Sequence, residues 1–76
     1  MEVCITSCYR FTPLQEDSLS GLARALEIYA ETKKILGLVL IGHEGVNLTI
    51  SGDAAAIEGL KNLLAEILQL DDLQFK

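Results

Sequence analysis

The sequence predicts an α+β domain in which the elements follow the order strand, helix, strand, strand, helix, strand. Three patterns lead to this prediction. Residues 3–11 alternate between apolar and other side chains, as half-buried strands do. Residues 19–33 and 54–67 carry apolar side chains at spacings of three and four, which is typical of amphipathic helices. Residues 38–51 hold two short strand-like runs around a glycine-flanked turn, which indicates a hairpin.

The start of the first helix is marked by residues with strong local preferences. Thr12 is a suitable cap, Pro13 fits the first turn, and Gln15 follows the cap by three residues. The helix is therefore expected to begin between Pro13 and Ser18. Its apolar stripe ends near Ile35, where we expect the helix to end.

The second half of the chain contains the hairpin, the second helix and a last strand. Leu38 to Ile41 and Val46 to Ser51 are expected to be antiparallel strands, with the turn at residues 42–45. Asp53 is placed to cap the second helix, which should end before the pair of aspartates that follows it. Leu73 to Lys76 are long enough for one short fourth strand.

This order of elements implies a ferredoxin-like sandwich, in which a four-stranded antiparallel sheet is covered by two helices on one face. A chain of 76 residues builds one hydrophobic core, so residues 1–76 form a single domain. In this topology the first strand pairs with the third. Arg10 and Asn47 are therefore expected to lie near each other.

The alternation of the strands also predicts which side chains face the helices. We expect the apolar residues of the third strand to face them together with Val3, Ile5 and Tyr9. The other sheet face would then be open, small and polar. It would carry Cys4, Thr6, Cys8, Arg10, Asn47, Thr49 and Ser51.

Composition narrows the classes of partner. Six basic and eleven acidic residues give a net charge of −5, so the chain has no general attraction to phosphate backbones or anionic membranes. Its apolar runs are far shorter than the roughly 20 residues that cross a bilayer, and we expect a cytoplasmic protein without a membrane segment. Cys4 and Cys8 lie about 13 Å apart along a strand, too far for a disulfide. With two cysteines and one histidine, no metal and no cofactor are predicted.

Three activities can be considered for this sequence, and for each of them a necessary feature is missing. Cys4 and Arg10 have the C-x5-R spacing of tyrosine phosphatases, but the residues between them form a strand without a glycine. Arg10 and Asn47 are the residue types of acylphosphatases, but Pro13 lies where amides should cradle a phosphate. RNA-recognition modules need aromatics on the third strand, which has none. A noncatalytic interaction domain and a small acylphosphatase-type hydrolase both stay open.

Residues 42–52, GHEGVNLTISG, resemble the AEEGINGTIAG segment in the N-terminal domain of the rhodanese-related tRNA uridine hydroxylases. Residues 9–14, YRFTPL, are similar to the YKFxPL of that family, and residues 37–41 to its GTILL strand. The match covers nearly the whole chain in order and without large gaps. Two positions depart from the family pattern: Leu48 replaces a glycine and His43 replaces an acidic residue.

The resemblance implies an acylphosphatase-like domain at the N-terminal end of a longer protein. The family places a rhodanese domain with an active-site cysteine after this one, and it is associated with oxygen-dependent hydroxylation of the wobble uridine of tRNA. This domain would be a noncatalytic accessory that docks on the rhodanese domain or shapes the tRNA site. We expect no hydroxylase or sulfurtransferase activity from the isolated chain, since neither cysteine lies in a loop. The motif and interaction residues that the resemblance marks are Tyr9, Arg10, Glu44, Gly45, Asn47 and Thr49.

Overall fold

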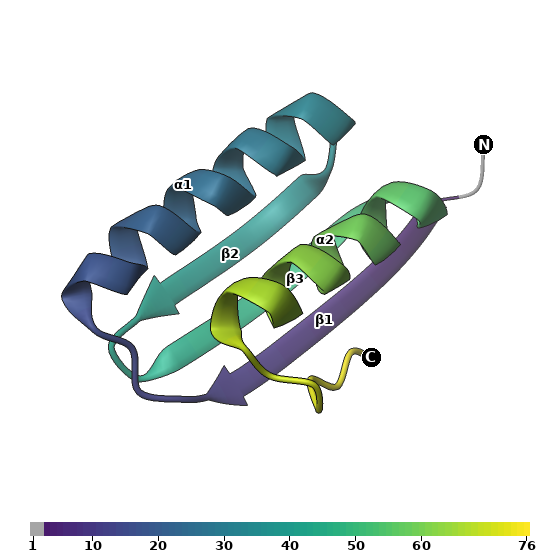
Figure 1. Ribbon diagram of the computed structural model, residues 1–76. Coiled ribbons are helices and arrows are strands. Elements are labelled where there is room, and N and C mark those ends of the chain that lie inside the picture. The colour runs from purple at the N-terminus through teal and green to yellow at the C-terminus, as the bar shows by residue number, and fades with distance from the viewer. Residues whose placement is uncertain (1–2) are drawn as a thin grey trace.

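The computed structural model describes residues 3–76 and contains three strands and two helices. The strands form one antiparallel sheet in the order β1-β3-β2, and both helices cover the same face of it (Figure 1). The predicted α+β class, the hairpin and the helical layer are confirmed. The elements are β1 (Val3–Phe11), α1 (Glu16–Lys33), β2 (Leu36–Gly42), β3 (Gly45–Asp53) and α2 (Ala54–Leu68).

The predicted fourth strand is not formed, since the sheet within residues 3–76 has three strands. The segment after α2 runs back beside β1, and its Leu73 and Phe75 pack against the core. The Ser7 N–H donates to the Lys76 oxygen at 2.9 Å, and the Lys76 N–H donates to the Ser7 oxygen at 2.8 Å. This reciprocal pair is one rung of an antiparallel ladder. The prediction of a four-stranded sheet was therefore wrong, because a single rung does not make a strand.

The side of β1 that faces the helices is the side that we predicted to be open. Thr6 pairs with Ile50 and Cys8 pairs with Leu48, and residues paired across a ladder point to the same side. Ile50 and Leu48 are buried under the helices at 2% and 1% exposure, so Thr6 and Cys8 are buried with them. The residues predicted to face the helices are exposed instead: Val3 by 66%, Ile5 by 75% and Tyr9 by 70%.

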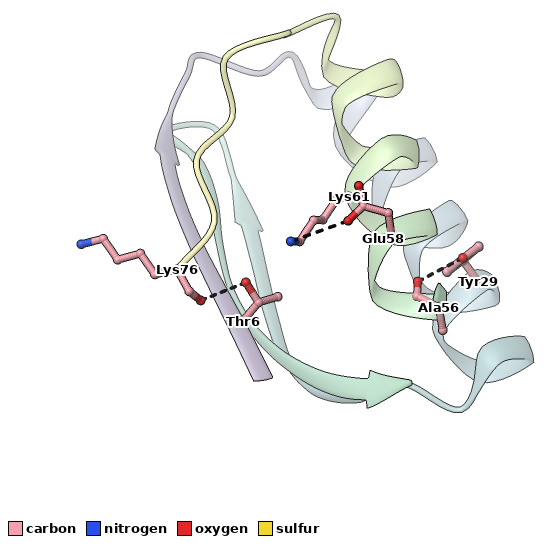
Figure 2. A network of polar contacts seen from close by, with 6 residues as sticks. All are labelled: Thr6, Tyr29, Ala56, Glu58, Lys61 and Lys76. Atoms are coloured by element: carbon pink, nitrogen blue, oxygen red, sulfur yellow. Dashed lines mark hydrogen bonds and ion pairs between the residues drawn. The ribbon is translucent and has the colours of Figure 1, made fainter. Parts of the chain in front are cut away.

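Small side chains on the helix-facing side of β1 suit the packing because α2 supplies the large ones. Leu60 and Leu64 of α2 are 1% and 0% exposed. The Thr6 hydroxyl tolerates burial because it donates a hydrogen bond of 2.9 Å to the Lys76 oxygen (Figure 2). The buried core comprises Cys8, Leu22, Leu26, Ile35, Val46, Leu48, Ile50, Ala56, Ile57, Leu60 and Leu64.

Both helices begin where we predicted, since α1 starts at Glu16, within residues 13–18, and α2 follows Asp53, but only one of the two predicted caps is formed. The Asp53 carboxylate accepts the Ala55 N–H at 3.2 Å, so the predicted cap of α2 is confirmed. The N-cap of α1 is Gln15, whose side chain makes no cap bond, and the predicted capping box starting at Thr12 was wrong. The Tyr29 hydroxyl then joins the two helices by donating to a backbone oxygen in the first turn of α2 at 3.1 Å (Figure 2).

Candidate functional site

The sheet face that points away from the helices presents large apolar side chains. The strands and helices form two layers, and both helices lie on one side of the sheet (Figure 2). On the other side, β1 and β2 contribute side chains that are exposed by 54% or more. The predicted small, polar and thiol-lined face was therefore wrong for β1, whose Cys4, Thr6, Cys8 and Arg10 lie on the helix side. Asn47, Thr49 and Ser51 of β3 do lie on the open face, as predicted. The exposed residues are Val3, Ile5, Tyr9 and Phe11 of β1 and Leu36, Leu38 and Leu40 of β2.

β3 runs between these two rows and contributes smaller, polar side chains. Its Asn47 and Thr49 are exposed and its Ser51 is half-buried. We call the large β1 residues the β1 ridge, the three leucines the β2 ridge, and the β3 residues between them the central trough. Pairing sets the rows Ile5–Ser51–Leu36, Ser7–Thr49–Leu38 and Tyr9–Asn47–Leu40 across the sheet, and none of these nine side chains is charged.

The turn between β2 and β3 is fastened to the loop between β1 and α1. The Thr12 N–H donates to the Glu44 oxygen at 2.9 Å, and the Leu14 N–H donates to the His43 oxygen at 3.0 Å. The His43 Nδ1 also lies 3.2 Å from the Leu14 oxygen. The backbones of His43 and Glu44 therefore hold the loop, while their side chains remain exposed.

Gly45 lies very close to the backbone of Arg10 and Thr12 at this end of the sheet. Its φ of 141° lies in the region that favours glycine. A Cβ at Gly45 would collide with the Arg10 oxygen and lie 2.8 Å from the Thr12 nitrogen. Gly37 has a similar φ of 133°, which the sequence reading did not foresee, and its Cβ would collide with the Thr49 oxygen.

A shallow hollow opens at the hairpin end of the open face. It brings together five of the six residues that the resemblance to the hydroxylase family marked. These are Tyr9, Arg10, Glu44, Gly45 and Asn47. The sixth, Thr49, lies one row further along the central trough.

Arg10 and Asn47 are neighbours in the ladder but point to opposite sides of the sheet. Arg10 pairs with Val46 on the helix side, and its Nη1 lies 3.1 Å from the Asp72 Oδ1. Asn47 pairs with Tyr9 on the open side. The predicted proximity is therefore confirmed for the backbone, but the side chains do not converge on one ligand.

In the loop after β1, residues 12–14 offer no free amide to a phosphate. The N–H groups of Thr12 and Leu14 are engaged by the hairpin turn, and Pro13 between them has no N–H. An acylphosphatase binds its anion through amides of this loop, so that reaction has no cradle here.

The two cysteines are free and lie on the helix side of β1. Cys8 is 4% exposed, and burial raises the pKa of its thiol, an effect that the positive charge of Arg10 partly opposes. A thiol that is buried and protonated is a poor nucleophile. Within residues 3–76, no group of three or more His, Cys, Asp or Glu side chains is placed to hold a metal ion. None of the described helices has the length and apolar character to cross a membrane.

The sequence reading missed the β2 ridge. Leu36, Leu38 and Leu40 alternate with Val39 and Ile41, so β2 is apolar on both of its faces. A strand of this kind indicates cover on both sides of the sheet. This signal was present in the sequence and would have identified the open face as apolar.

Comparison with known proteins supplies the family. The model of the UPF0176 acylphosphatase like domain matches residues 3–76. A tRNA uridine(34) hydroxylase of Parasynechococcus marenigrum (strain WH8102) is 42% identical over 72 residues, which cover 95% of this chain and 22% of that protein. One of Synechococcus sp. (strain CC9902) is 42% identical over 66 residues, covering 87% and 22%. One of Bdellovibrio bacteriovorus is 36% identical over 73 residues, covering 95% and 20%.

The chain thus spans about a fifth of the length of these curated relatives. On β1, Cys8 is buried and Arg10 is paired with Asp72. The family match extends over every described residue. The chain belongs to the family of UPF0176 acylphosphatase-like domains.

Proposed function

We propose that this chain is a noncatalytic accessory domain of a cytoplasmic tRNA uridine hydroxylase, in which it docks on a rhodanese domain and helps to shape the tRNA site. The names of the relatives support the reaction, because each is a tRNA uridine(34) hydroxylase. Their length supports the accessory role, because about four fifths of each relative lies outside the matching segment and is available for catalysis.

The observation that carries the proposal is the apolar open face. Contiguous apolar patches of this kind are rare on monomeric proteins and mark interaction sites. The cores of protein interfaces are poor in charge and rich in aromatic residues, as this face is with Tyr9 and Phe11. We therefore propose that the residues of the open face contact the rest of the enzyme.

The alternative, a small acylphosphatase-type hydrolase, is disfavoured by the geometry at Arg10. This arginine is paired with Asp72 and points away from Asn47, so the two cannot act on one phosphate. A hydrolase would also need loop amides that the hairpin turn already engages.

Thr49→Arg tests the assignment, because the exposed Thr49 lies in the central trough where an arginine would hold a docked surface away. The variant is made in the Parasynechococcus marenigrum relative with its matching segment replaced by this chain. In cells without their own hydroxylase, we expect the wild-type chimaera to hydroxylate uridine 34 and the variant to lose this activity, as measured by mass spectrometry of tRNA nucleosides.

Asn62→Arg is the matched control, because Asn62 is exposed on the helical layer and the same side chain is introduced. Both variants of the isolated chain should melt at the wild-type temperature. Full hydroxylation by the Thr49 variant would reject the open face. Loss of hydroxylation by the Asn62 variant alone would in addition assign the contact to the helical layer.

A further inference from the structure

We propose that two copies of this chain associate through the free edge of β2, which pairs antiparallel with β2 of the second copy across a two-fold axis at Val39. This inference concerns the edge of the sheet and not its open face, so it goes beyond the docking role proposed above. The two sheets of three strands each would become one continuous sheet.

The hydrogen bonds of the neighbouring strands determine which backbone groups of β2 point outward. The N–H and C=O of Ser7 bond to Lys76, so they point away from β3. Antiparallel ladders alternate between hydrogen-bonded and non-hydrogen-bonded pairs. Thr49, the partner of Ser7, therefore turns its own groups toward β2 and bonds to Leu38. By the same alternation, the residues of β2 whose N–H and C=O groups point outward are Gly37, Val39 and Ile41.

This edge of β2 is uncovered in the described part of the chain. β2 is the last strand in the order β1-β3-β2, and no segment within residues 3–76 pairs with its outer side (Figure 1). Val39 and Ile41 are only half-buried beneath α1, so the helix leaves room beside them for another strand. Proteins usually protect such an edge with charged residues, proline or a bulge, and residues 36–42 have none of these.

Pairing with a second copy gives every outward group of β2 a partner. In the register centred on Val39, this residue faces Val39 of the second copy, and Gly37 faces Ile41 of the second copy. Each of these facing pairs can exchange two hydrogen bonds, because their groups point toward each other. A shift by two residues would move Gly37 or Ile41 beyond the end of the facing strand and leave its groups unpaired.

The side chains of β2 also fit this register. On the helix side, Ile41 lies opposite Gly37 of the second copy, and on the open side Leu36 lies opposite Gly42 of the second copy. Each of these large side chains therefore meets a glycine. The other two leucines of the β2 ridge face each other. Self-pairing would place like charges close together in a charged strand, but β2 has no charge.

Other pairings fit less well. At the opposite edge of the sheet, Ser7 of β1 already exchanges hydrogen bonds with Lys76, which a second copy would have to displace. A strand from elsewhere in the enzyme could form the same backbone bonds with β2. The match between glycines and large side chains, however, arises when β2 faces itself, as a two-fold contact requires.

NMR of a mixture of isotopically labelled and unlabelled chain tests the register. Leu38 and Leu40 of the second copy would form a non-hydrogen-bonded pair, whose Cα atoms lie about 4.5 Å apart. We therefore expect an isotope-filtered contact between the Hα atoms of Leu38 in one copy and Leu40 in the other. Contacts between copies from Tyr9 or Phe11 instead would show that the open faces stack and would overturn the pairing through β2.

Val39→Pro tests the association itself by sedimentation equilibrium at the concentration of the NMR sample. The proline removes the N–H at the centre of the pairing, and this N–H points outward, so the bonds between β2 and β3 are retained. Val39→Ala is the matched control, because it shortens the side chain and keeps the N–H. We expect the wild type and the alanine variant to sediment with twice the mass of one chain, and the proline variant with the mass of one chain.

Two results of this experiment would overturn the proposal. One is a wild-type chain that sediments as a monomer, which would leave the docking role of the open face untouched. The other is a proline variant that remains dimeric while its circular dichroism spectrum matches the wild type. If the proline variant does not fold, the contact between Leu38 and Leu40 of the two wild-type copies decides, and its absence overturns the pairing.

Discussion

At Gly45 the hairpin turn lies so close to the end of β1 that a side chain would not fit between them. Its φ of 141° and the position of the Arg10 oxygen both exclude a Cβ. The turn can therefore lie close enough for the Thr12 N–H to reach the Glu44 oxygen. The glycine was identifiable from the hairpin pattern, but the strand contact at Gly37 was not, because it depends on how β2 lies against β3.

Gly45→Ala is predicted to lower the free energy of unfolding by at least about 1 kcal/mol, because a Cβ is strained at this φ and meets backbone atoms. Gly42→Ala is the matched control from the same hairpin, since a Cβ at Gly42 meets nothing within 4 Å. Urea denaturation of both variants measures the difference. Equal stability of the two variants would show that the contact at Gly45 does not constrain the turn.

The two residues that depart from the family pattern lie in different parts of the structure. Leu48, where the family has glycine, is 1% exposed and belongs to the core beneath the helices. His43, where the family has an acidic residue, lies in the turn with its ring nitrogen near the Leu14 oxygen. Neither residue belongs to the central trough or its ridges, although His43 lines the hollow beside them, so both departures are compatible with docking through the trough and ridges.

At the scale of elements, periodicity predicted the two helices and the hairpin but not the orientation of β1. Both faces of this strand contain side chains that can be buried, such as Cys8 on one and Ile5 on the other. Alternation alone assigns the more apolar face to the core. The core here takes the smaller face because Leu60 and Leu64 of α2 fill the space above it. The more apolar face of β1 is left open.

Asp53→Ala is predicted to destabilise the domain by about 1 kcal/mol, because it removes the acceptor for the Ala55 N–H at the start of α2. Asp53→Asn keeps an acceptor oxygen and should stay close to wild type. Thermal unfolding followed by circular dichroism compares the two variants. If the alanine variant matches the asparagine variant, the cap does not contribute to the stability of α2.

For the whole molecule, the two faces of the sheet have different roles. Helices cover one face and build the core, whereas the other face exposes two apolar ridges with an uncharged trough between them. The resemblance in the sequence predicted the family and a role in docking on a rhodanese domain or in shaping the tRNA site. The composition of the docking surface could not follow from it, since that depended on the face that β1 turns outward. We propose that the rest of the enzyme covers this face.

Hydroxyl-radical footprinting tests this claim by comparing the isolated chain with the full-length chimaera. Tyr9 and Phe11 are 70% and 65% exposed in the isolated chain and react readily with hydroxyl radicals, and Ile28 on the helical layer provides a reference at 52%. We predict that oxidation of Tyr9 and Phe11 falls several-fold in the chimaera while oxidation of Ile28 is unchanged. Equal oxidation of Tyr9 and Phe11 in the two proteins would show an uncovered face and contradict the docking role.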